Sequence, residues 1–315
     1  MSSRPRRAHG RCQEVPTMED VVVIGGGAGG LNAALTLCRV RRRVLVVDSG
    51  EPRNAPAERV HGFVSRDGTP PAELLAAGRA EVERHGGRFA DGEVRTIRRR
   101  DGVFAVELAD RVVSARRVVV ATGLRDELPG VPGLRERWGR DVLHCPFCHG
   151  YEVRDQPLGV MGGLRASVHQ ALLLRQLSDD VVIFAEEVDD RDRARLAARG
   201  VRIVRAAIAG LDVEDDALRG VRLADGTVVA RSALFVPAPP VPNDALLAGL
   251  GCERDGDGLV RVDGNGLTSV PGVWAVGNVV DPRAQVVVAA GAGAKAAIAV
   301  NADLMEEELV EERAA

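Results

Sequence analysis

One strand–turn–helix segment near the start of the chain restricts the possible folds more than any other feature. The β-branched run Val21–Ile24 predicts a buried parallel strand, and Gly25–Gly30 (Gly-Gly-Gly-Ala-Gly-Gly) follows it and opens a helix. Its first, third and sixth residues match G-x-G-x-x-G, whose glycines allow a tight turn, close approach to a pyrophosphate, and close helix–strand packing. A second run, Val44–Val47, ends in Asp48, where an acidic residue about 20 positions after the glycines binds a ribose hydroxyl. This order of parts favours a Rossmann-type nucleotide site over a glycine-rich packing turn.

Two segments from distant parts of the chain extend this site. Arg117–Gly123 predicts a strand ending in a tight turn, and Val273–Asn278 predicts a strand that runs into a polar cap. A helix of small residues over 289–299 follows, and its positive N-terminal end near Gln285 would stabilise negative charge on a reduced flavin. These pieces match flavoproteins in which FAD lies across one Rossmann domain made from both ends of the chain, so FAD is the implied cofactor. The contacts expected from these segments are Gly25, Gly26, Gly27, Ala28, Gly30, Asp48, Ala121, Thr122, Gly123, Gly277, Asn278, Gln285 and Val286.

The segment His144–Gly150 (His-Cys-Pro-Phe-Cys-His-Gly) carries two cysteines separated by two residues. Such a pair can close and reopen a disulfide, and its surroundings can lower the pKa of one thiol. Cys145–His149 also matches the C-x-x-C-H attachment pattern of a c-type haem, but that needs an exported, haem-loading context. A zinc site needs two further ligands, and the other three cysteines stand alone. Two buried structural cysteines are the third alternative, which explains neither the spacing nor the flanking histidines. Redox chemistry is therefore the favoured interpretation, with no metal.

Composition narrows the class of protein. The 315 residues carry a formal net charge of −3 and are 28% charged and 3% aromatic, which argues against a nucleic-acid surface and suits a globular protein of about two domains. No apolar run is expected to approach the length needed to span a bilayer. Residues 1–17 are rich in arginine but lack an apolar core, so they are not a secretory signal; we expect a disordered tail, or an upstream start with Met18 as the natural one. The sparse cysteines favour the cytoplasm.

With these motifs in place, the chain resembles the low-molecular-weight thioredoxin reductase family from about Met18 to Leu304. The resemblance implies an α/β fold with two Rossmann-like domains of the FAD/NAD(P)-binding, three-layer ββα type, the second inserted into the first, and a homodimer. Proline- and glycine-rich segments at 128–133 and 237–242 suit the two linkers where the chain passes between the domains. We therefore expect an FAD-binding domain at 18–124 and 241–315, and an inserted domain carrying the cysteines at 125–240.

The residue sequence of His144–Glu152 is more similar to a sub-branch of this family, which includes the dithiol oxidases of gliotoxin- and holomycin-type biosynthesis. By this resemblance, Cys145 exchanges with substrate, Cys148 lies against the flavin, and His149 replaces an aspartate that serves reductases as general acid/base. A histidine, with an unperturbed pKa near 6.5, can take a proton from a substrate thiol at neutral pH. A loop similar to that of the sub-branch adds further expected FAD contacts, namely Ser49, Arg53, Asn54 and His61.

The inserted domain departs from the reductase pattern at its own glycine turn. Counted from Gly162, the second and third glycine positions hold Leu164 and Ser167, and a leucine there occupies space that a pyrophosphate needs. The next strand ends in Ala185-Glu186-Glu187, where two carboxylates would repel the 2′-phosphate of NADPH. We therefore expect FAD to be bound and NADPH not to be bound.

Without a nicotinamide donor, electrons are expected to run from substrate to oxygen. The sequence predicts an FAD-dependent oxidase that closes a disulfide in a small-molecule dithiol, with O2 as acceptor and H2O2 as product. Two alternatives stay open at this point: a thioredoxin reductase-like disulfide reductase with another donor such as ferredoxin, and a flavin-binding redox sensor without turnover. The acidic run Glu306–Glu308 near the end of the chain is expected to be a frayed helix end.

Overall fold

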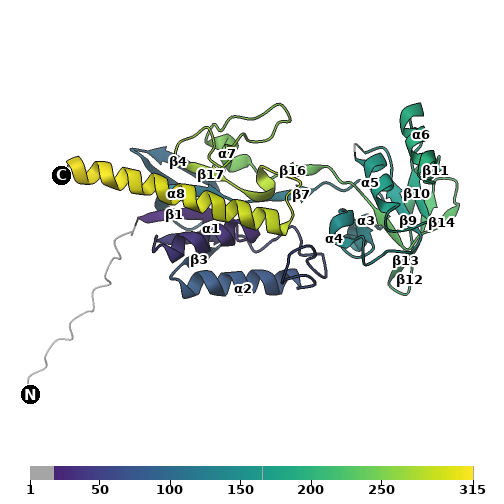
Figure 1. Cartoon of the computed structure of the whole chain (residues 1–315), viewed down its shortest axis with the longest axis horizontal. Helices are drawn as coiled ribbons and strands as arrows, with labels where there is room; N and C mark the ends of the chain where they lie inside the picture. Colours follow the sequence, from purple (N-terminus) through teal and green to yellow (C-terminus); the bar gives the residue numbers. More distant parts are fainter. Residues whose placement is uncertain (1–17, 165, 315) are drawn as a thin grey trace, which may run out of the picture.

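The computed structural model describes residues 18–164 and 166–314, so Cys12 and the arginine-rich segment 1–17 lie outside the described residues. The chain forms two α/β units (Figure 1), one built from both ends of the sequence and the other from its middle. Each unit has its own main sheet. In the sheet of the first unit, β6 (Val112–Val120) pairs with β1 (Glu19–Ile24) from the first part of the chain and with β17 (Val273–Ala275) from the last part. This arrangement confirms the predicted fold class, two Rossmann-like units with the second inserted into the first.

The first unit is a sheet of parallel strands to which an antiparallel hairpin is attached. The long strand β6 joins the two parts, because its first residues pair with β5 and its last residues pair with β1 and β17. The elements of this unit are β1 (Glu19–Ile24), α1 (Ala28–Arg39), β2 (Val44–Asp48), α2 (Pro71–Arg84), β3 (Arg88–Asp91), β4 (Thr96–Arg100), β5 (Val103–Glu107), β6 (Val112–Val120), α7 (Ala245–Gly249), β17 (Val273–Ala275), the 3-10 turn η1 (Gly277–Val279) and α8 (Val286–Ala314).

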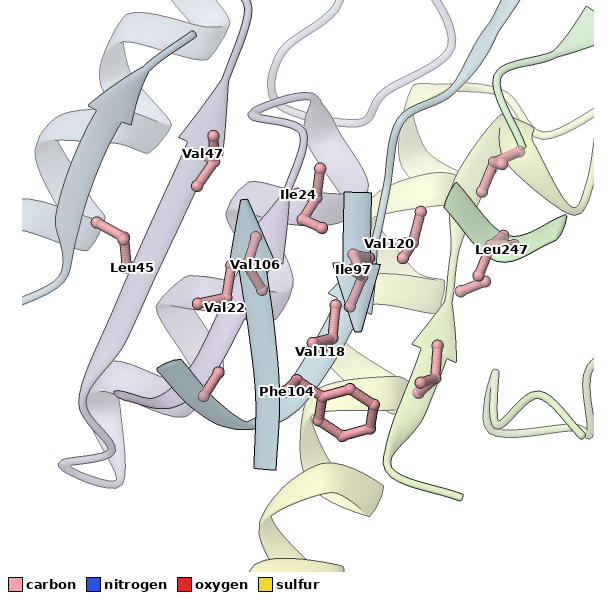
Figure 2. Packing of buried hydrophobic residues seen from close by; sticks show 14 of the residues in the cluster. Val22, Ile24, Leu45, Val47, Ile97, Phe104, Val106, Val118, Val120 and Leu247 are labelled. Carbon is pink, nitrogen blue, oxygen red and sulfur yellow. The ribbon is translucent and has the colours of Figure 1, made fainter. Parts of the chain in front are cut away.

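The valine-rich strands produce three layers because successive side chains point to opposite faces of the sheet. In β1, Val22 and Ile24 belong to a core shared with the β4–β5 hairpin, whereas Val21 and Val23 belong to a core shared with helices α1 and α8. Both cores are fully apolar at the strands, which explains why the strand sequences do not alternate with polar residues. Figure 2 shows the first core, with Val22, Ile24, Leu45, Val47, Ile97, Phe104, Val106, Val118, Val120 and Leu247 labelled.

Helix α8 is long and apolar enough to cross a membrane by length and composition, with 28% of its most apolar window buried. The expectation that no apolar run has that length was therefore wrong for α8. Its small residues serve helix packing instead, because α8 lies along α1 (Figure 1) and a Cβ added to Gly293 would meet the backbone of Gly29. Glycine at this crossing lets the two backbones approach closely.

Gly293→Ala is expected to destabilise the folded state by about 1–3 kcal/mol, because the new methyl group must push α1 and α8 apart. Gly291→Ala is the matched control, since a Cβ at Gly291 meets no atom within 4 Å, and the better helix propensity of alanine should stabilise α8 by up to about 1 kcal/mol. Thermal unfolding midpoints of the two variants test this, and equal shifts would contradict the proposed contact.

The acidic end of α8 is not frayed, so that expectation was wrong. Arg116 donates to Glu307 at 2.8 Å and to Glu308 at 2.7 Å, and Arg42 also pairs with Glu308. These arginines hold the pKa of Glu308 below its usual value. The ion pairs fix α8 at Glu307 and Glu308 to the middle of β6 and to the turn before β2, which the local sequence pattern does not reveal.

The second unit repeats the layered arrangement around a five-stranded parallel sheet ordered β11-β10-β9-β15-β8. In β10, Val181 and Ile183 pack with helices α5 and α6, while Val182 and Phe184 pack with the β12–β13–β14 meander. The elements of this unit are α3 (Leu134–Arg137), β8 (Val142–Leu143), α4 (Pro146–His149), β9 (Leu158–Met161), α5 (Ser167–Leu174), β10 (Val181–Phe184), α6 (Asp190–Ala198), β11 (Arg202–Val204), β12 (Ile208–Glu214), β13 (Ala217–Leu223), β14 (Val228–Ala230) and β15 (Ala233–Phe235).

Two antiparallel strands form the crossing between the units, namely β7 (Leu124–Asp126) and β16 (Pro240–Pro242). Beside this ribbon, the Thr122 hydroxyl donates to the Asn243 carbonyl at 2.7 Å, and the Asn243 side chain donates to the Thr122 carbonyl at 3.0 Å. The two chain segments are therefore bonded to each other where they leave the first unit.

Candidate active site

The two cysteines of the C-x-x-C motif form a disulfide at the end of a buried strand. Strand β8 pairs with β15 and delivers Cys145 to the N-cap of α4, where its carbonyl accepts the N–H groups of Cys148 and His149 at 3.1 Å each. Gly150 is the C-cap of α4, and it packs so closely that a Cβ there would collide with the Pro146 carbonyl and with Leu177. Figure 1 places α4 on the side of the second unit that faces the first. The motif is therefore a preformed, partly exposed disulfide on the side of the inserted unit where α4 lies.

Two histidines flank the disulfide in different environments. His149 is half-buried, and burial lowers its pKa, with Glu152 opposing the shift and the nearby His61 and His144 adding to it. His144 lies with Nδ1 3.3 Å from the Val236 carbonyl and with its ring 6.2 Å from the Trp138 ring. Burial also lowers the pKa of His144. Both rings are consequently neutral at pH 7, and a neutral imidazole can accept a proton.

His61 connects the first unit to the segment that follows the disulfide. Its Nε2 lies 3.4 Å from the Glu152 carboxylate, and its Nδ1 lies 3.4 Å from Asp67. Asp67 itself accepts the Gly62 N–H at 2.8 Å, which fixes the carboxylate behind the ring. The sequence placed His61 among the FAD contacts, and the structure adds a contact between the units.

Arg53 makes a second connection between the units. Its guanidinium binds Asp126 of β7 through two hydrogen bonds of 2.6 and 2.8 Å, and also donates to the Asn278 side-chain oxygen at 3.3 Å. The Asn278 amide group donates to the carbonyls of Asp281 and Ala284 at 3.0 and 2.9 Å. A bidentate arginine–carboxylate pair has fixed geometry, so Arg53 orients the β7 crossing relative to the loop before α8.

The glycine turn after β1 fits a pyrophosphate. Gly27 is the N-cap of the 12-residue helix α1, and a Cβ at Gly27 would meet no atom within 4 Å. By contrast, a Cβ on Gly30 would collide with the Gly25 carbonyl, so this glycine permits close helix–strand packing. The first N–H groups of a helix lack acceptors within it, and open space in front of them suits a phosphate. Asp48 accepts the Gly26 N–H at 2.9 Å and, as a carboxylate, retains acceptor capacity for a ribose hydroxyl.

The other predicted FAD contacts lie at the same edge of the sheet. The Ala121 N–H donates to the Ile24 carbonyl at 2.7 Å, and the Val276 N–H donates to the Val120 carbonyl at 3.0 Å. The turns after β1, β6 and β17 are therefore adjacent, and each contains a glycine with positive φ. These backbone positions and the start of α8 bring together Gly25, Ala28, Thr122, Gly123, Gly277, Gln285 and Val286. Ser49 is exposed and Asn54 is half-buried in the loop that also carries Arg53.

The corresponding turn of the second unit is hydrogen-bonded internally through one of its own side chains. The Ser167 hydroxyl donates to the Met161 carbonyl at 2.7 Å and lies 3.2 Å from the Leu164 N–H, which donates to it. Leu164 packs against the apolar core between the sheet and the β12–β13–β14 meander. A cavity of about 490 Å³ lies at the ends of β9 and β10, and Glu186 and Glu187 contribute carboxylates to its lining. The turn differs from the open glycine turn of the first unit.

These features define a two-unit oxidoreductase with one nucleotide-binding turn suited to FAD and a reactive disulfide on the inserted unit. The family model for pyridine nucleotide-disulphide oxidoreductases matches residues 19–294. The chain belongs to this family of FAD-dependent enzymes.

Known proteins agree with this assignment and confirm the resemblance to thioredoxin reductases. A probable thioredoxin reductase from Arthroderma benhamiae is 32% identical over 91% of this chain and 81% of its own length. The crystal structure of HlmI is similar with a TM-score of 0.92 and 58% identity, covering 94% of this chain and 95% of HlmI. The structure of an oxidoreductase from Agrobacterium tumefaciens follows with a TM-score of 0.86 and 36% identity, covering 92% and 99%.

Sequence reasoning missed several residues that hold the site together. Asp126 and Glu152 receive the contacts from Arg53 and His61, and Gln170 of α5 donates from its side chain to the His144 carbonyl. Only Glu152 had a usable signal, because it follows His149 by three residues and such residues lie on one side of a helical turn. Among the described residues, no group of three or more His, Cys, Asp or Glu side chains is arranged to hold a metal ion.

Proposed function

We propose that this protein is an FAD-dependent dithiol oxidase that closes a disulfide in a small-molecule dithiol and uses O2 as acceptor, producing H2O2. The observation that carries the proposal is the pairing of a preformed Cys145–Cys148 disulfide with a second nucleotide turn that carries Leu164 and Ser167 at two glycine positions, the Leu164 N–H already donating to the Ser167 hydroxyl. Identity of 58% to HlmI, against 32% to a curated thioredoxin reductase, also supports a function apart from the reductases.

Thiol–disulfide exchange at the cysteine pair accounts for the substrate half of the reaction. His149 takes the proton of one substrate thiol, and the resulting thiolate attacks the Cys145 sulfur, which forms a mixed disulfide and releases Cys148 as a thiolate. The second thiol of the substrate then attacks the substrate sulfur of the mixed disulfide. This closes the cyclic disulfide of the product and releases Cys145 as a free thiol. Two electrons and two protons thus leave the substrate for each disulfide formed.

The first unit would hold FAD at the turns after β1, β6 and β17. Gly27 and the start of α1 would receive the pyrophosphate, Asp48 would bind the adenine-side ribose, and Asn278 and Gln285 would lie nearer the isoalloxazine end. Bound FAD supplies the two-electron step from the reduced cysteine pair to oxygen. Arg53 and His61 hold the inserted unit in the orientation that directs the disulfide at this site.

NADPH is proposed not to be the electron donor. Leu164 stands at a motif position where a glycine would let the backbone approach a pyrophosphate, and its N–H already donates to the Ser167 hydroxyl. Glu186 and Glu187 line the neighbouring cavity, and their charges repel a 2′-phosphate. Curated relatives named thioredoxin reductase favour a second candidate, a disulfide reductase. In this chain such an enzyme would take its electrons from a donor other than NADPH.

Anaerobic titration separates these functions. A dithiol such as dithiothreitol is expected to bleach the flavin of the purified FAD-loaded protein at a rate at least equal to kcat, whereas NADPH and NADH leave the flavin oxidised. Admitting air should restore the absorbance and yield about one H2O2 for each dithiol consumed. Rapid bleaching by NADPH would show that the second nucleotide site works, and bleaching by reduced ferredoxin without oxygen uptake would favour the reductase.

Two further proposals concern assembly and location. We propose a homodimer, which the exposed apolar side chains of α8 support, because Ile298 and Val310 are 66% and 65% exposed on a helix that packs well on its other side. The sparse cysteines and the single redox pair support a cytoplasmic protein, without a membrane or nucleic-acid partner.

A further inference from the structure

Gln170 of α5 is a buried polar side chain that reaches the segment of the redox pair. It is 6% exposed, and its Nε2 donates to the His144 carbonyl, one peptide before Cys145. The opposite orientation of the amide would place its oxygen against this carbonyl, and two acceptors repel each other. The hydrogen bonds between β8 and β15 end just before this point, where the Leu143 carbonyl accepts the Val236 N–H at 2.8 Å. Gln170 therefore binds the backbone where the sheet stops holding it.

The redox segment 144–150 is held at both of its ends by α5 and the turn after this helix. At the first end, Gln170 binds the His144 carbonyl. At the other end, Leu177 lies so close to Gly150 that a Cβ on this glycine would collide with the leucine side chain. Both cysteines of the pair lie between these two points. The disulfide therefore opens and closes within a segment whose ends are fixed to the same part of the chain.

Helix α5 is itself fixed at its first residue. Ser167 is 2% exposed, and its hydroxyl donates to the Met161 carbonyl at 2.7 Å and accepts the Leu164 N–H at 3.2 Å. Gln170 follows about one turn later on the same helix, so these bonds also set the place from which its side chain reaches the redox segment. The turn that departs from the nucleotide motif thus anchors the helix that carries Gln170.

We propose that Gln170 is a positioning residue that sets the reduction potential of the Cys145–Cys148 pair. Its hydrogen bond holds the backbone before Cys145 in the place that the closed disulfide requires, and so keeps the two sulfurs near each other after reduction. Two thiols held close together have a high effective concentration, which makes their disulfide harder to reduce.

This role concerns the couple in which the disulfide takes up two electrons and two protons and becomes two thiols. It rests on the proposed function in that the same pair exchanges with the substrate dithiol. The potential itself is a property of the protein without substrate, so it can be measured whether the enzyme works as an oxidase or as a reductase.

Gln170→Met removes the donor and keeps the length of the side chain. The FAD-loaded protein is equilibrated without oxygen in mixtures of reduced and oxidised dithiothreitol, which supplies the two electrons and two protons. Free thiols are then alkylated, and mass spectrometry gives the fraction of open pair. The equilibrium constant for reduction is expected to rise about tenfold over the wild type, the scale of one hydrogen bond lost to a buried group. This corresponds to a potential about 30 mV higher.

Gln170→Glu keeps the shape of the side chain and makes the donor depend on pH. A protonated carboxyl group can donate to the His144 carbonyl, whereas a carboxylate can only repel it, and burial raises the pKa of a carboxyl group. Below that pKa the variant should have the wild-type potential measured at the same pH, and above it a higher one. General damage to the fold would not be reversed by acid, so this variant separates positioning from a structural role.

Ser178→Ala is the matched control. Ser178 is 5% exposed just after α5, and its hydroxyl donates to the Gln156 carbonyl, outside the redox segment. The control should unfold at a lower temperature and keep the wild-type potential.

A wild-type potential in Gln170→Met, or an equal shift in Ser178→Ala, would overturn the positioning role. If Gln170→Met does not fold, Gln170→Glu gives the answer, and a difference from the wild type that does not change with pH would overturn the role. If the potential shifts as expected but the wild-type enzyme takes up no oxygen with dithiols, the oxidase function falls and the role of Gln170 stands.

Discussion

Cys148→Ser is expected to lower kcat for dithiol oxidation by at least about 10³-fold, because a hydroxyl cannot form the disulfide that takes electrons from substrate. Cys145→Ser should be equally inactive. Cys252→Ser is the matched control, since this cysteine is buried in the core of the first unit and burial raises its pKa. Oxygen uptake with dithiothreitol measures all three variants, and only the control should retain turnover.

The same two variants distinguish the roles of the sulfurs. In Cys148→Ser, the Cys145 thiol is expected to form a stable mixed disulfide with a reagent such as 5,5′-dithiobis(2-nitrobenzoate), because the residue that would release it is gone. In Cys145→Ser, Cys148 should react more slowly, since the proposed roles place it toward the cofactor and away from solvent. Mass spectrometry of the trapped proteins gives both rates. Faster trapping at Cys148 would reverse the assignment.

The fold could be predicted from the sequence because its signals are local. The strand formed by Val21–Ile24 is fully buried, and a Cβ on Gly30 would collide with the Gly25 carbonyl. This contact lies within one strand–turn–helix unit, so the spacing of a few residues reports it. The redox pair was predictable for the same reason, because Cys145 and Cys148 are three positions apart.

The long-range polar contacts, within the first unit and between the units, could not be predicted because their partners are far apart in sequence. Arg53 lies 73 positions from Asp126 and 225 positions from Asn278. Arg116 pairs with Glu308 across 192 positions, so the acidic end of α8 reads as a solvated run in the sequence alone. Arginine and carboxylate residues are abundant on protein surfaces, and no periodicity selects which of them meet. For Arg53 and His61 the sequence therefore predicted contacts with FAD but not their contacts between the units.

His149→Gln is expected to lower kcat/KM for dithiols about 10²- to 10⁴-fold at pH 7, since glutamine cannot take the substrate proton. Burial lowers the pKa of His149 below its usual 6.5, so the neutral, proton-accepting form persists to lower pH. The wild-type rate should accordingly fall only as pH drops through this lowered pKa. In the variant, the rate should instead rise about tenfold per pH unit up to the substrate thiol pKa, roughly 8.5, because only thiolate already present can react.

Glu152→Gln gives a second test of His149 as the proton acceptor. The Glu152 carboxylate raises the pKa of His149 against the effect of burial, so its removal should move the acid limb of the rate profile to still lower pH. His144→Gln is the control, because His144 also flanks the disulfide and is also held neutral by burial, but it faces the Val236 carbonyl. Its acid limb should persist and move only slightly, to higher pH, because the charge of His144 no longer lowers the pKa of His149. If His144→Gln abolished the limb and His149→Gln preserved it, the proton acceptor would be His144, and the thiolate would form on the other side of the disulfide.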